Sequence, residues 1–349
     1  MAKFVTIVCA IFVSVYLAEP TLQFLSDERI KYINEVAKTW KAERYFPANT
    51  SEEYFIGLLG SRGYKNYTNE VEIKKYDPLY VENNSPKQFD SRENWKSCKQ
   101  IGHIRDQGNC GSCWSFSTTG AFADRLCVST GGKFNQLLSP EELAFCCMDC
   151  GKGCGGGYPI KAWKYFRTQG VTTGGDYDTK EGCMPYKVPP CYDEQGKNTC
   201  GGKPMERNHQ CPKTCYGKTT VQDRYKTKNE YVINSIETIE QDLMTYGPVE
   251  ASFDVYDDFS VYKSGIYRKT PKAKYEGGHS IKIIGWGEEN GTPYWLAVNS
   301  WSKFWGDHGT FKIIKGRNEC GIERAVTAGI PSTSRGPQHL HDDINNNIQ

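Results

Sequence analysis

Hydrophobic residues near the N-terminus recur three and four positions apart, which is the spacing of one helix face. Between Leu25 and Trp40 they stand at positions 30, 33, 36, 37 and 40, behind Ser26, a suitable N-cap residue. We predict an amphipathic helix over this stretch and a second, short helix from Ser51 to Leu59. The residues from there to Asn84 are rich in glycine, tyrosine and charge and offer few core candidates. This region is therefore expected to depend on the domain that follows it.

The pattern next predicts helices and then, in the last third of the chain, strands. One helix is expected from Cys113 to about Val128, and another from Ser139, which has the spacing of a capping box with Glu142. Beyond about Thr220, runs of β-branched and aromatic residues alternate with glycine-containing turns. The predicted strands are Tyr231–Ile233, Val249–Val255, Ile281–Trp286, Tyr294–Val298 and Thr310–Ile314. A helical half and a β-rich half should therefore meet at a cleft.

The N-terminus has the form of a secretory signal. Lys3 precedes an apolar run from Phe4 to Leu17 that is too short to span a bilayer, and cleavage near Ala18 is expected. No later stretch of the sequence is apolar enough to form a membrane span. Of the 15 cysteines, one lies in this signal and all others lie from Cys98 onward. A cysteine-free, removable segment thus precedes a cysteine-dense domain of an oxidising compartment.

Charge narrows the class of function. The formal net charge is +2, with basic and acidic residues interspersed, so nothing indicates a nucleic-acid partner. The polar, asparagine-rich tail over residues 332–349 is expected to be disordered. Asn-x-Ser/Thr sequons, which predict glycosylation, begin at Asn49, Asn66, Asn83 and Asn290.

The most informative motif is Gln107-Gly-Asn-Cys110-Gly-Ser112-Cys113-Trp. A cysteine is a strong nucleophile as thiolate, which a helix N-terminus and a neighbouring imidazolium both favour. Ser112 is a good N-cap residue directly before Cys113, so a helix dipole would favour the charged sulfur. The run therefore indicates a nucleophilic thiol.

Two residues far downstream complete this chemistry. His279, which follows two glycines, can act as the base, and Asn299 can hydrogen-bond its second ring nitrogen to fix its orientation. Gln107 can donate its side-chain amide to a developing oxyanion, together with the N–H of Cys113. These four residues predict acyl transfer through a thioester.

Three of these four residues, Cys113, His279 and Asn299, also have a plainer interpretation. Cys110 and Cys113 are spaced as in redox or zinc sites, although no second metal-type pair follows. His279 precedes an apolar run and can be a packed core histidine, and Asn299 can be a turn residue. A disulfide-stapled structural protein would explain the cysteines but not the Cys-Gly-Ser-Cys-Trp run.

The order Gln, Cys, His, Asn and the run Cys-Gly-Ser-Cys-Trp resemble the papain-like cysteine peptidases. Within that family the chain is most similar to the cathepsin B type. The matching runs are Leu25-Ser-Asp-Glu, residues 146–159, residues 182–191 and Gly247-Pro-Val-Glu. In such enzymes, the Pro-Pro-Cys191 element opens an insertion that forms an occluding loop over the primed end of the cleft.

The resemblance implies an α+β, papain-like fold of two lobes. The left lobe would be helical and disulfide-rich, the right lobe β-barrel-like, and the active-site cleft would lie between them. We expect a signal peptide at 1–18, an inhibitory propeptide at 19–84, here called the prosegment, and a peptidase domain at 85–331. Its left lobe would span about 97–218, including the occluding loop at 191–200, and its right lobe about 219–331 plus 85–96.

The same resemblance implies six disulfides and leaves Cys113 and Cys320 free. The implied pairs are Cys98–Cys127, Cys110–Cys154, Cys146–Cys211, Cys147–Cys150, Cys183–Cys215 and Cys191–Cys200. Spacing alone does not choose these pairs. Once the signal cysteine and the nucleophile are set aside, the number of remaining cysteines is odd, so at least one further free thiol is expected.

Substrate contacts are carried over in the same way. They fall on Gly156, Gly157, Tyr158, Pro159, Gly278, Ser280, Trp301 and Ala325. Relatives often carry at the position of Ala325 a glutamate able to pair with arginine. Without that charge, the pocket for the residue before the scissile one is expected to prefer aromatic or aliphatic side chains.

The occluding loop departs from the family pattern. Asp193 and Glu194 stand where cathepsin B has two histidines that bind the C-terminal carboxylate of the substrate. Two carboxylates would repel that group and cannot hold the loop to Asp106 as a histidine would, so we expect reduced carboxydipeptidase activity. The alternative is a surface hairpin whose charges are merely solvated.

The preferred interpretation is a cathepsin B-like cysteine endopeptidase, a hydrolase made as a secretory zymogen for lysosomal or digestive proteolysis. It would be lysosomal or extracellular, would need no metal or other cofactor, and would act as a monomer. Expected partners are protein and peptide substrates, its own propeptide as inhibitor, and cystatin-type inhibitors. The alternative is a catalytically weak, peptide-binding relative, which the retention of all four catalytic residues disfavours.

Overall fold

The structure, a computed structural model, describes residues 23–62, 71–77, 85–217 and 224–332. The expected signal peptide, the sequons at Asn66 and Asn83, and the tail after residue 332 lie outside these residues. Asn49 and Asn290 are both exposed, as glycosylation requires.

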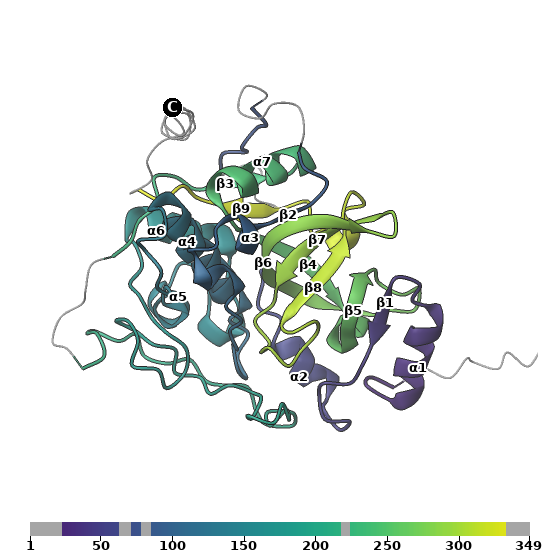
Figure 1. Cartoon of the computed structure of the whole chain (residues 1–349). Coiled ribbons are helices and arrows are strands. Elements are labelled where there is room, and N and C mark those ends of the chain that lie inside the picture. The colour runs from purple at the N-terminus through teal and green to yellow at the C-terminus, as the bar shows by residue number, and fades with distance from the viewer. Residues whose placement is uncertain (1–22, 63–70, 78–84, 218–223, 333–349) are drawn as a thin grey trace, which may run out of the picture.

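The described residues form a helical half and a sheet half that lie side by side (Figure 1). The longer helices are α1 (Asp27–Val36), α2 (Glu52–Gly57), α4 (Cys113–Ser129), α5 (Pro140–Cys146), α6 (Pro159–Thr168) and α7 (Ile236–Tyr246), with a short α3 (Ser91–Asn94). Single 3₁₀ turns are Lys99–Gly102, Gly153–Gly155, Asp257–Val261 and Glu319–Gly321. Helices α5 and α6 both pack on α4, which in turn contacts the sheet.

The sheet half is one nine-stranded sheet in the order β1-β5-β8-β7-β6-β4-β9-β3, with β2 paired to β6. Its strands are β1 (Trp40–Ala42), β2 (Phe89–Asp90), β3 (Tyr231–Ile233), β4 (Val249–Tyr256), β5 (Tyr262–Tyr267), β6 (Tyr275–Glu289), β7 (Thr292–Val298), β8 (Thr310–Ile314) and β9 (Val326–Ala328). Among the described residues the end strands β1 and β3 do not pair with each other. The barrel-like lobe expected from the sequence is therefore an open sheet.

A buried ion pair ties the two halves together. Lys282 on β6 places its Nζ 2.5 Å from Asp124 Oδ2 on α4, and both side chains are almost fully buried. Around it α4 is buried along nearly its whole length, which explains its run of small and apolar residues. The two walls of the expected cleft are thus fixed relative to each other.

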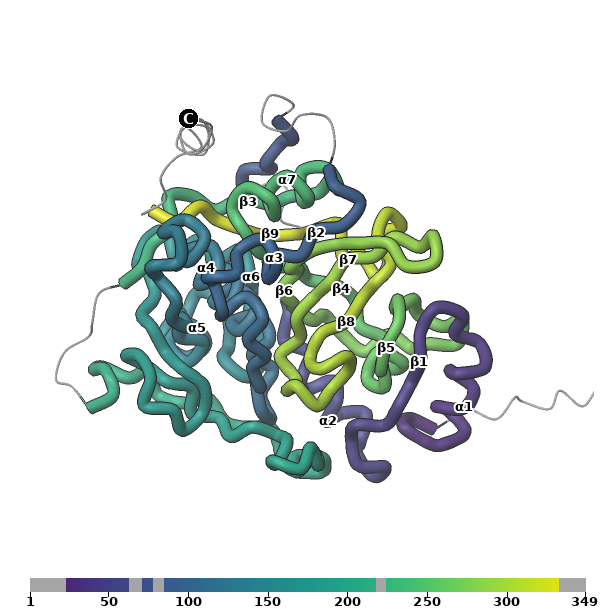
Figure 2. The backbone as a smooth tube through the Cα atoms, in the orientation of Figure 1, coloured from purple at the N-terminus to yellow at the C-terminus, as the bar shows by residue number. Residues whose placement is uncertain are grey.

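The prosegment crosses both halves. Helix α1 begins behind Ser26, whose Oγ accepts the N–H of Arg29 at 3.1 Å, but it ends at Val36, earlier than the hydrophobic spacing predicted. Trp40 instead opens strand β1, which pairs with β5 and places the indole against Tyr262 and Tyr267. Figure 2 shows the purple chain passing from this outer edge to α2, below the two halves.

The middle of the chain carries six disulfides, and they are the pairs that the resemblance implied. Cys113 and Cys320 are the free cysteines of the described chain, and both are buried. Cys110 is bonded to Cys154, so the Cys-x-x-Cys spacing is not a metal or redox pair here.

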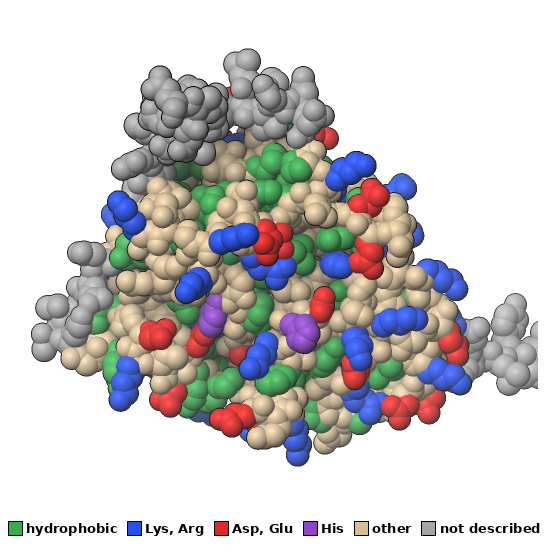
Figure 3. All heavy atoms as spheres, viewed as in Figure 1, with side chains coloured by type: hydrophobic (Ala, Val, Ile, Leu, Met, Phe, Trp, Pro, Cys, Tyr) green, Lys and Arg blue, Asp and Glu red, His purple; other side chains and the backbone are tan. Residues whose placement is uncertain are grey.

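The surface of the protein carries charges of both signs. On the face shown in Figure 3, basic and acidic side chains are interspersed rather than gathered by sign. Within the described residues, none of the helices combines the length and apolar character that a membrane span requires.

Ser139 caps α5 through the N–H of Glu142, but the predicted capping box is only half formed, because the Glu142 carboxylate accepts the N–H and hydroxyl of Thr172.

Candidate active site

Cys113 is the first residue of α4 and is completely buried. Its Sγ lies 3.2 Å from the N–H of Gly60 in the prosegment. Burial raises the pKa of the Cys113 thiol to about 11, and the backbone N–H groups of Ser280, Gly60 and Trp114 offset this only in part. With the prosegment in place the thiol is therefore protonated.

The N-cap contact predicted for Ser112 is wrong. The helix does begin after Ser112, but the serine makes no side-chain capping bond. Its hydroxyl lies 2.8 Å from the hydroxyl of Tyr186, which also donates to the carbonyl of Gln107. Ser112 thus leaves the helix N-terminus open to the thiol, and Tyr186, which the sequence did not single out, supports the loop that carries Gln107.

His279 on β6 and Asn299 after β7 meet as the sequence predicted. His279 Nε2 lies 2.8 Å from Asn299 Oδ1, which also accepts the N–H of Ser300 at 2.8 Å. Because an amide oxygen only accepts, Nε2 carries the ring proton and Nδ1 keeps a free lone pair. Within the described chain, Nδ1 has no hydrogen-bond partner. Burial lowers the pKa of His279 to about 4, so the imidazole is neutral.

Trp301 covers the histidine. Its ring lies 4.6 Å from the imidazole, centroid to centroid, and is itself packed edge-on against Phe55 of the prosegment at 5.6 Å. The indole excludes water from the bond between His279 and Asn299, which strengthens that bond.

Gln107 points its side-chain amide at a prosegment carbonyl. Its Nε2 donates to Leu58 O at 3.0 Å and to Cys110 O, while its Oε1 accepts the hydroxyl of Ser300 at 2.7 Å. Ser300 therefore fixes which end of the amide faces the cleft. Leu58 O thus accepts a hydrogen bond from the amide that the sequence analysis assigned to a developing oxyanion.

Two glycines predicted as substrate contacts bind the prosegment backbone. Gly157 donates to Gly60 O at 2.9 Å and accepts the N–H of Arg62 at 2.8 Å, and Gly278 O accepts the N–H of Ser61 at 3.0 Å. A Cβ on Gly157 would lie 2.5 Å from the Trp114 ring, and one on Gly60 would lie 1.8 Å from Gly111 O. Glycine at position 157 thus leaves room for the Trp114 ring, and glycine at position 60 lets the two backbones approach this closely.

A chain of hydroxyl groups lies beneath Ser61. Its Oγ is 2.8 Å from Ser252 Oγ, which is 3.0 Å from Ser280 Oγ. Ser252 also donates to the buried carboxyl of Glu250 at 2.7 Å. Burial raises the pKa of Glu250 to about 7, and the hydroxyls of Thr327, Ser252 and Ser280 offset part of this effect.

Ser252 and Glu250 were missed at the sequence level, although a signal for them exists. The two residues are separated by one position on β4, so their side chains lie on the same face of the strand. Ser252 stands directly opposite Ser280 on the neighbouring strand β6. The surroundings of Ser280 are consequently more polar than the residues predicted as substrate contacts. The apolar Ala325 is also buried, but it packs with Ile160, Val232 and Val71.

The other predicted contacts border this region. Pro159 begins α6, Tyr158 precedes it and is partly exposed, and Gly156 has a φ of 95° that favours glycine. The occluding loop is closed by Cys191–Cys200, and its base is held to Asp106, which accepts the N–H of Cys191 at 3.2 Å. The loop is thus held at Asp106 without a histidine.

The two loop carboxylates have different surroundings. Asp193 Oδ1 accepts the N–H groups of Gln195 at 3.1 Å and Lys197 at 2.8 Å, so it stabilises the turn of its own loop. Glu194 is exposed to solvent. Of the two, Asp193 thus has a structural role, which favours the plainer interpretation for this residue.

Two models of known protein families match this chain. Residues 85–330 match the model of the papain family cysteine protease, and residues 25–64 match that of the peptidase family C1 propeptide. The chain belongs to the papain family of cysteine proteases. It is a hydrolase of the cathepsin B-like type and is made with a propeptide.

Three relatives support this assignment. The chain is 39% identical to the cathepsin B-like cysteine proteinase 4 of Caenorhabditis elegans, over 94% of this chain and 99% of that protein. It is 43% identical to the cathepsin B-like cysteine proteinase of Schistosoma japonicum, over 88% and 92%. Among solved structures, procathepsin B S9 from Trypanosoma congolense aligns with a TM-score of 0.77 and 32% identity, covering 89% of this chain and 99% of that one.

Proposed function

We propose that this cathepsin B-like protease is the zymogen of an endopeptidase that works through Cys113, His279 and Asn299, with Gln107 as oxyanion donor. The observation that carries the proposal is how the prosegment contacts these residues. The Gln107 amide donates to the carbonyl oxygen of Leu58, and two residues further along the prosegment the N–H of Gly60 donates to the Cys113 thiol. One stretch of peptide backbone thus contacts both the thiol and the amide donor, which supports a site that binds and cuts a peptide chain.

The reaction follows from the free lone pair on His279. After the prosegment leaves, Nδ1 takes the proton of Cys113 Sγ, and the thiolate attacks the peptide carbonyl carbon. The oxyanion is held by Gln107 Nε2–H and the N–H of Cys113. Nδ1–H then gives its proton to the departing amine as the C–N bond breaks, leaving a thioester. Water attacks the thioester, His279 takes a proton from it, and the C–S bond breaks to release the acid and restore the thiol.

The test compares the two free cysteines. The wild type, Cys113→Ala and Cys320→Ala proteins are processed to the same length, by an added protease where necessary, and assayed with Phe-Arg and Arg-Arg fluorogenic peptides at acid pH. We expect Cys113→Ala to lose at least about a thousandfold in kcat. Cys320→Ala should stay within about twofold of wild type. Processed wild type without turnover would favour the peptide-binding relative instead.

We also propose reduced carboxydipeptidase activity, since neither Asp193 nor Glu194 offers a cation to a substrate carboxylate. Because Asp193 supports its own turn, the informative variant is Glu194→His alone, with Asp193→His/Glu194→His as the family-like pair. A gain in dipeptide release from a peptide with a free C-terminus is expected. If release is unchanged while the loop stays folded, the loop chemistry is not limiting.

Entry into the secretory pathway, with a lysosomal or extracellular destination, is supported by the six disulfides and by the exposed sequons at Asn49 and Asn290. The test is a mobility shift of the protein on deglycosylation. We expect the shift in the wild type and its loss in a variant in which all four sequon asparagines, at positions 49, 66, 83 and 290, are replaced by glutamine. Protein that is never glycosylated in cells would contradict this route.

A further inference from the structure

The prosegment has a second docking surface beyond the cleft. Residues 71–77 lie along β3, the last strand in the sheet order, on the edge not paired with β9. Lys74 N donates to Val232 O, and Val232 N donates to Glu72 O, each at 2.9 Å. The segment therefore completes an open sheet edge, as in recognition by β-augmentation.

Two more contacts hold the segment along its length. Gln241 on α7 receives the N–H of Asp77 at 3.0 Å through Oε1 and donates from Nε2 to Asp77 O at 2.7 Å. At the other end, Val71 packs on Ile160, Val232 and Ala325. Backbone contacts predominate, so most positions of the segment are bound whatever their side chain.

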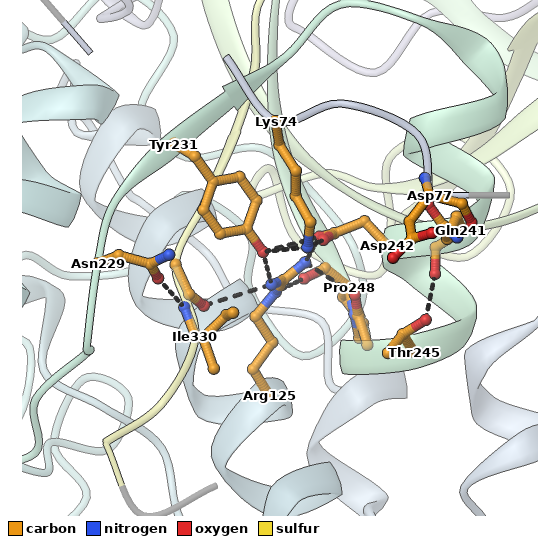
Figure 4. A network of polar contacts seen from close by, with 12 residues as sticks. Lys74, Asp77, Arg125, Asn229, Tyr231, Gln241, Asp242, Thr245, Pro248 and Ile330 are labelled. Carbon is orange, nitrogen blue, oxygen red and sulfur yellow. Dashed lines mark hydrogen bonds and ion pairs between the residues drawn. The ribbon is translucent and has the colours of Figure 1, made fainter. Parts of the chain in front are cut away.

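Lys74 is the exception, because its ammonium group enters a formed pocket (Figure 4). Nζ lies 2.5 Å from Asp242 Oδ1, and 4.5 and 4.2 Å from the ring centroids of Tyr231 and Tyr246. Two aromatic faces and a carboxylate provide the surroundings that select a cation.

The pocket is built by the peptidase domain alone. The Asp242 carboxylate is fully buried, accepts the Tyr231 hydroxyl at 2.9 Å, and is paired to the buried Arg125, whose Nη1 also donates to Tyr231 at 2.9 Å. These groups hold the carboxylate in place independently of Lys74. Removal of the prosegment would therefore leave a preformed lysine pocket beside a free strand edge.

We infer that the matured enzyme uses this surface, formed by β3, Gln241, Asp242 and Tyr246, as an exosite for an extended, lysine-bearing segment of a protein substrate. The inference rests on the proposed maturation, in which the residues up to 84 are removed. Continuity with the cleft favours a substrate as the occupant. The prosegment reaches both surfaces with only residues 63–70 between them, so one extended protein chain can occupy both.

The expected ligand has an apolar residue three positions before a lysine, as Val71 and Lys74 are spaced, and its other positions are bound through the backbone. The probe is an acetylated, fluorescein-labelled peptide with the sequence of residues 70–78. It is titrated against matured enzyme whose Cys113 has been alkylated with iodoacetamide, so that binding does not depend on catalysis. We expect saturable binding with a Kd below about 1 mM. A Lys74→Met peptide should bind about tenfold more weakly, and a Lys75→Met peptide as the parent does.

The enzyme side supplies matched variants. Tyr246→Leu removes one aromatic face without unpairing the buried Arg125, and it should weaken the peptide about fivefold while leaving kcat/KM for the Phe-Arg peptide unchanged. Tyr177→Leu, at another partly exposed tyrosine, should change neither. Equal binding of the Lys74→Met and Lys75→Met peptides, or no saturation by the parent peptide, would overturn the exosite. Loss of catalysis in unmodified enzyme would instead count against the proposed function.

Discussion

The two free cysteines of this chain are both buried, yet only one stands in a site that can use a thiol. Cys113 begins a helix and faces backbone N–H groups that lower its pKa, although burial outweighs them. Cys320 has Glu319 and Asp258 nearby, and burial together with these carboxylates raises its thiol pKa far above the usual range. Burial alone does not distinguish them; the surrounding groups do.

The comparison also separates two kinds of cover. The N–H of Gly60 that reaches Cys113 belongs to the prosegment, whereas the neighbours named for Cys320 all belong to the peptidase domain. The proposed maturation would therefore uncover the thiol of Cys113 and leave that of Cys320 covered. The zymogen holds a neutral thiol and a neutral imidazole, and under the proposed mechanism the pair would become reactive when that cover is removed.

The comparison of the two cysteines predicts a large effect on alkylation. Iodoacetamide should modify Cys113 at least about a hundredfold faster in the matured enzyme than in the zymogen, because only the thiolate reacts and the prosegment keeps the thiol neutral. Cys320 should stay unmodified in both forms. Mass spectrometry of digests at timed intervals gives both rates, with Cys113→Ala zymogen as the blank. Equal labelling of the two cysteines in the matured enzyme would remove the distinction drawn between them.

The next effect concerns Gln107, the proposed oxyanion donor. Gln107→Ala should lower kcat by about 10²–10³, the usual cost of one such donor. Ser300→Ala, which removes the hydroxyl that orients Gln107, should cost about tenfold in kcat with KM little changed, because it acts only through the amide. Both are measured with the Phe-Arg peptide. A Ser300→Thr variant that restores the rate would show that the hydroxyl, rather than packing, is responsible.

Ser300 illustrates what the sequence could and could not predict. The cysteine, histidine, asparagine and glutamine stood in recognisable motifs, and five strands of the β-rich half, β3, β4, β6, β7 and β8, were placed from hydrophobic runs, whereas β5 and β9 were not predicted. The contacts that orient them cross long separations in the chain, as Tyr186 does to Ser112, and no local pattern encodes such pairs. For the same reason Trp40, correctly spaced for a helix, lies in a strand, where its packing against Tyr262 and Tyr267 outweighs helical periodicity.

A smaller effect concerns pH and the prosegment. Glu52 on α2 and the buried Glu276 on β6 share Lys274, with N–O distances of 2.7 and 3.8 Å. Burial raises the pKa of Glu276 from 4.5 to about 8, and the Glu52 carboxyl adds to this shift. The docked state thus favours the protonated Glu276. This contribution to stability is complete below the ordinary pKa and is lost as the pH rises through about 8.

Glu276→Gln imitates the neutral form at every pH. In the inactive Cys113→Ala zymogen it should leave the Tm at pH 4 nearly unchanged and raise it at pH 8 by a few degrees, about 2–5 °C. Glu288→Gln, at an exposed position of the same strand, is the matched control and should shift neither value. Thermal unfolding between pH 4 and pH 9 measures this, and a pH profile parallel to that of the parent would contradict the role of Glu276.

The smallest effect tests the hydroxyl chain beneath the prosegment. Ser61→Ala removes one partner of Ser252, which keeps its bonds to Glu250 and Ser280, so the cost should be only about 1 kcal/mol of zymogen stability. A double-mutant cycle with Ser252→Ala in the Cys113→Ala zymogen isolates the direct contact, and denaturant unfolding should give a coupling energy of about 0.5–1 kcal/mol. If the two costs simply add, the hydroxyls of Ser61 and Ser252 make no direct stabilising contact. If they couple, Ser252 joins the residues that select substrates, and peptides with tyrosine before the scissile residue should lose more from Ser252→Ala than those with phenylalanine.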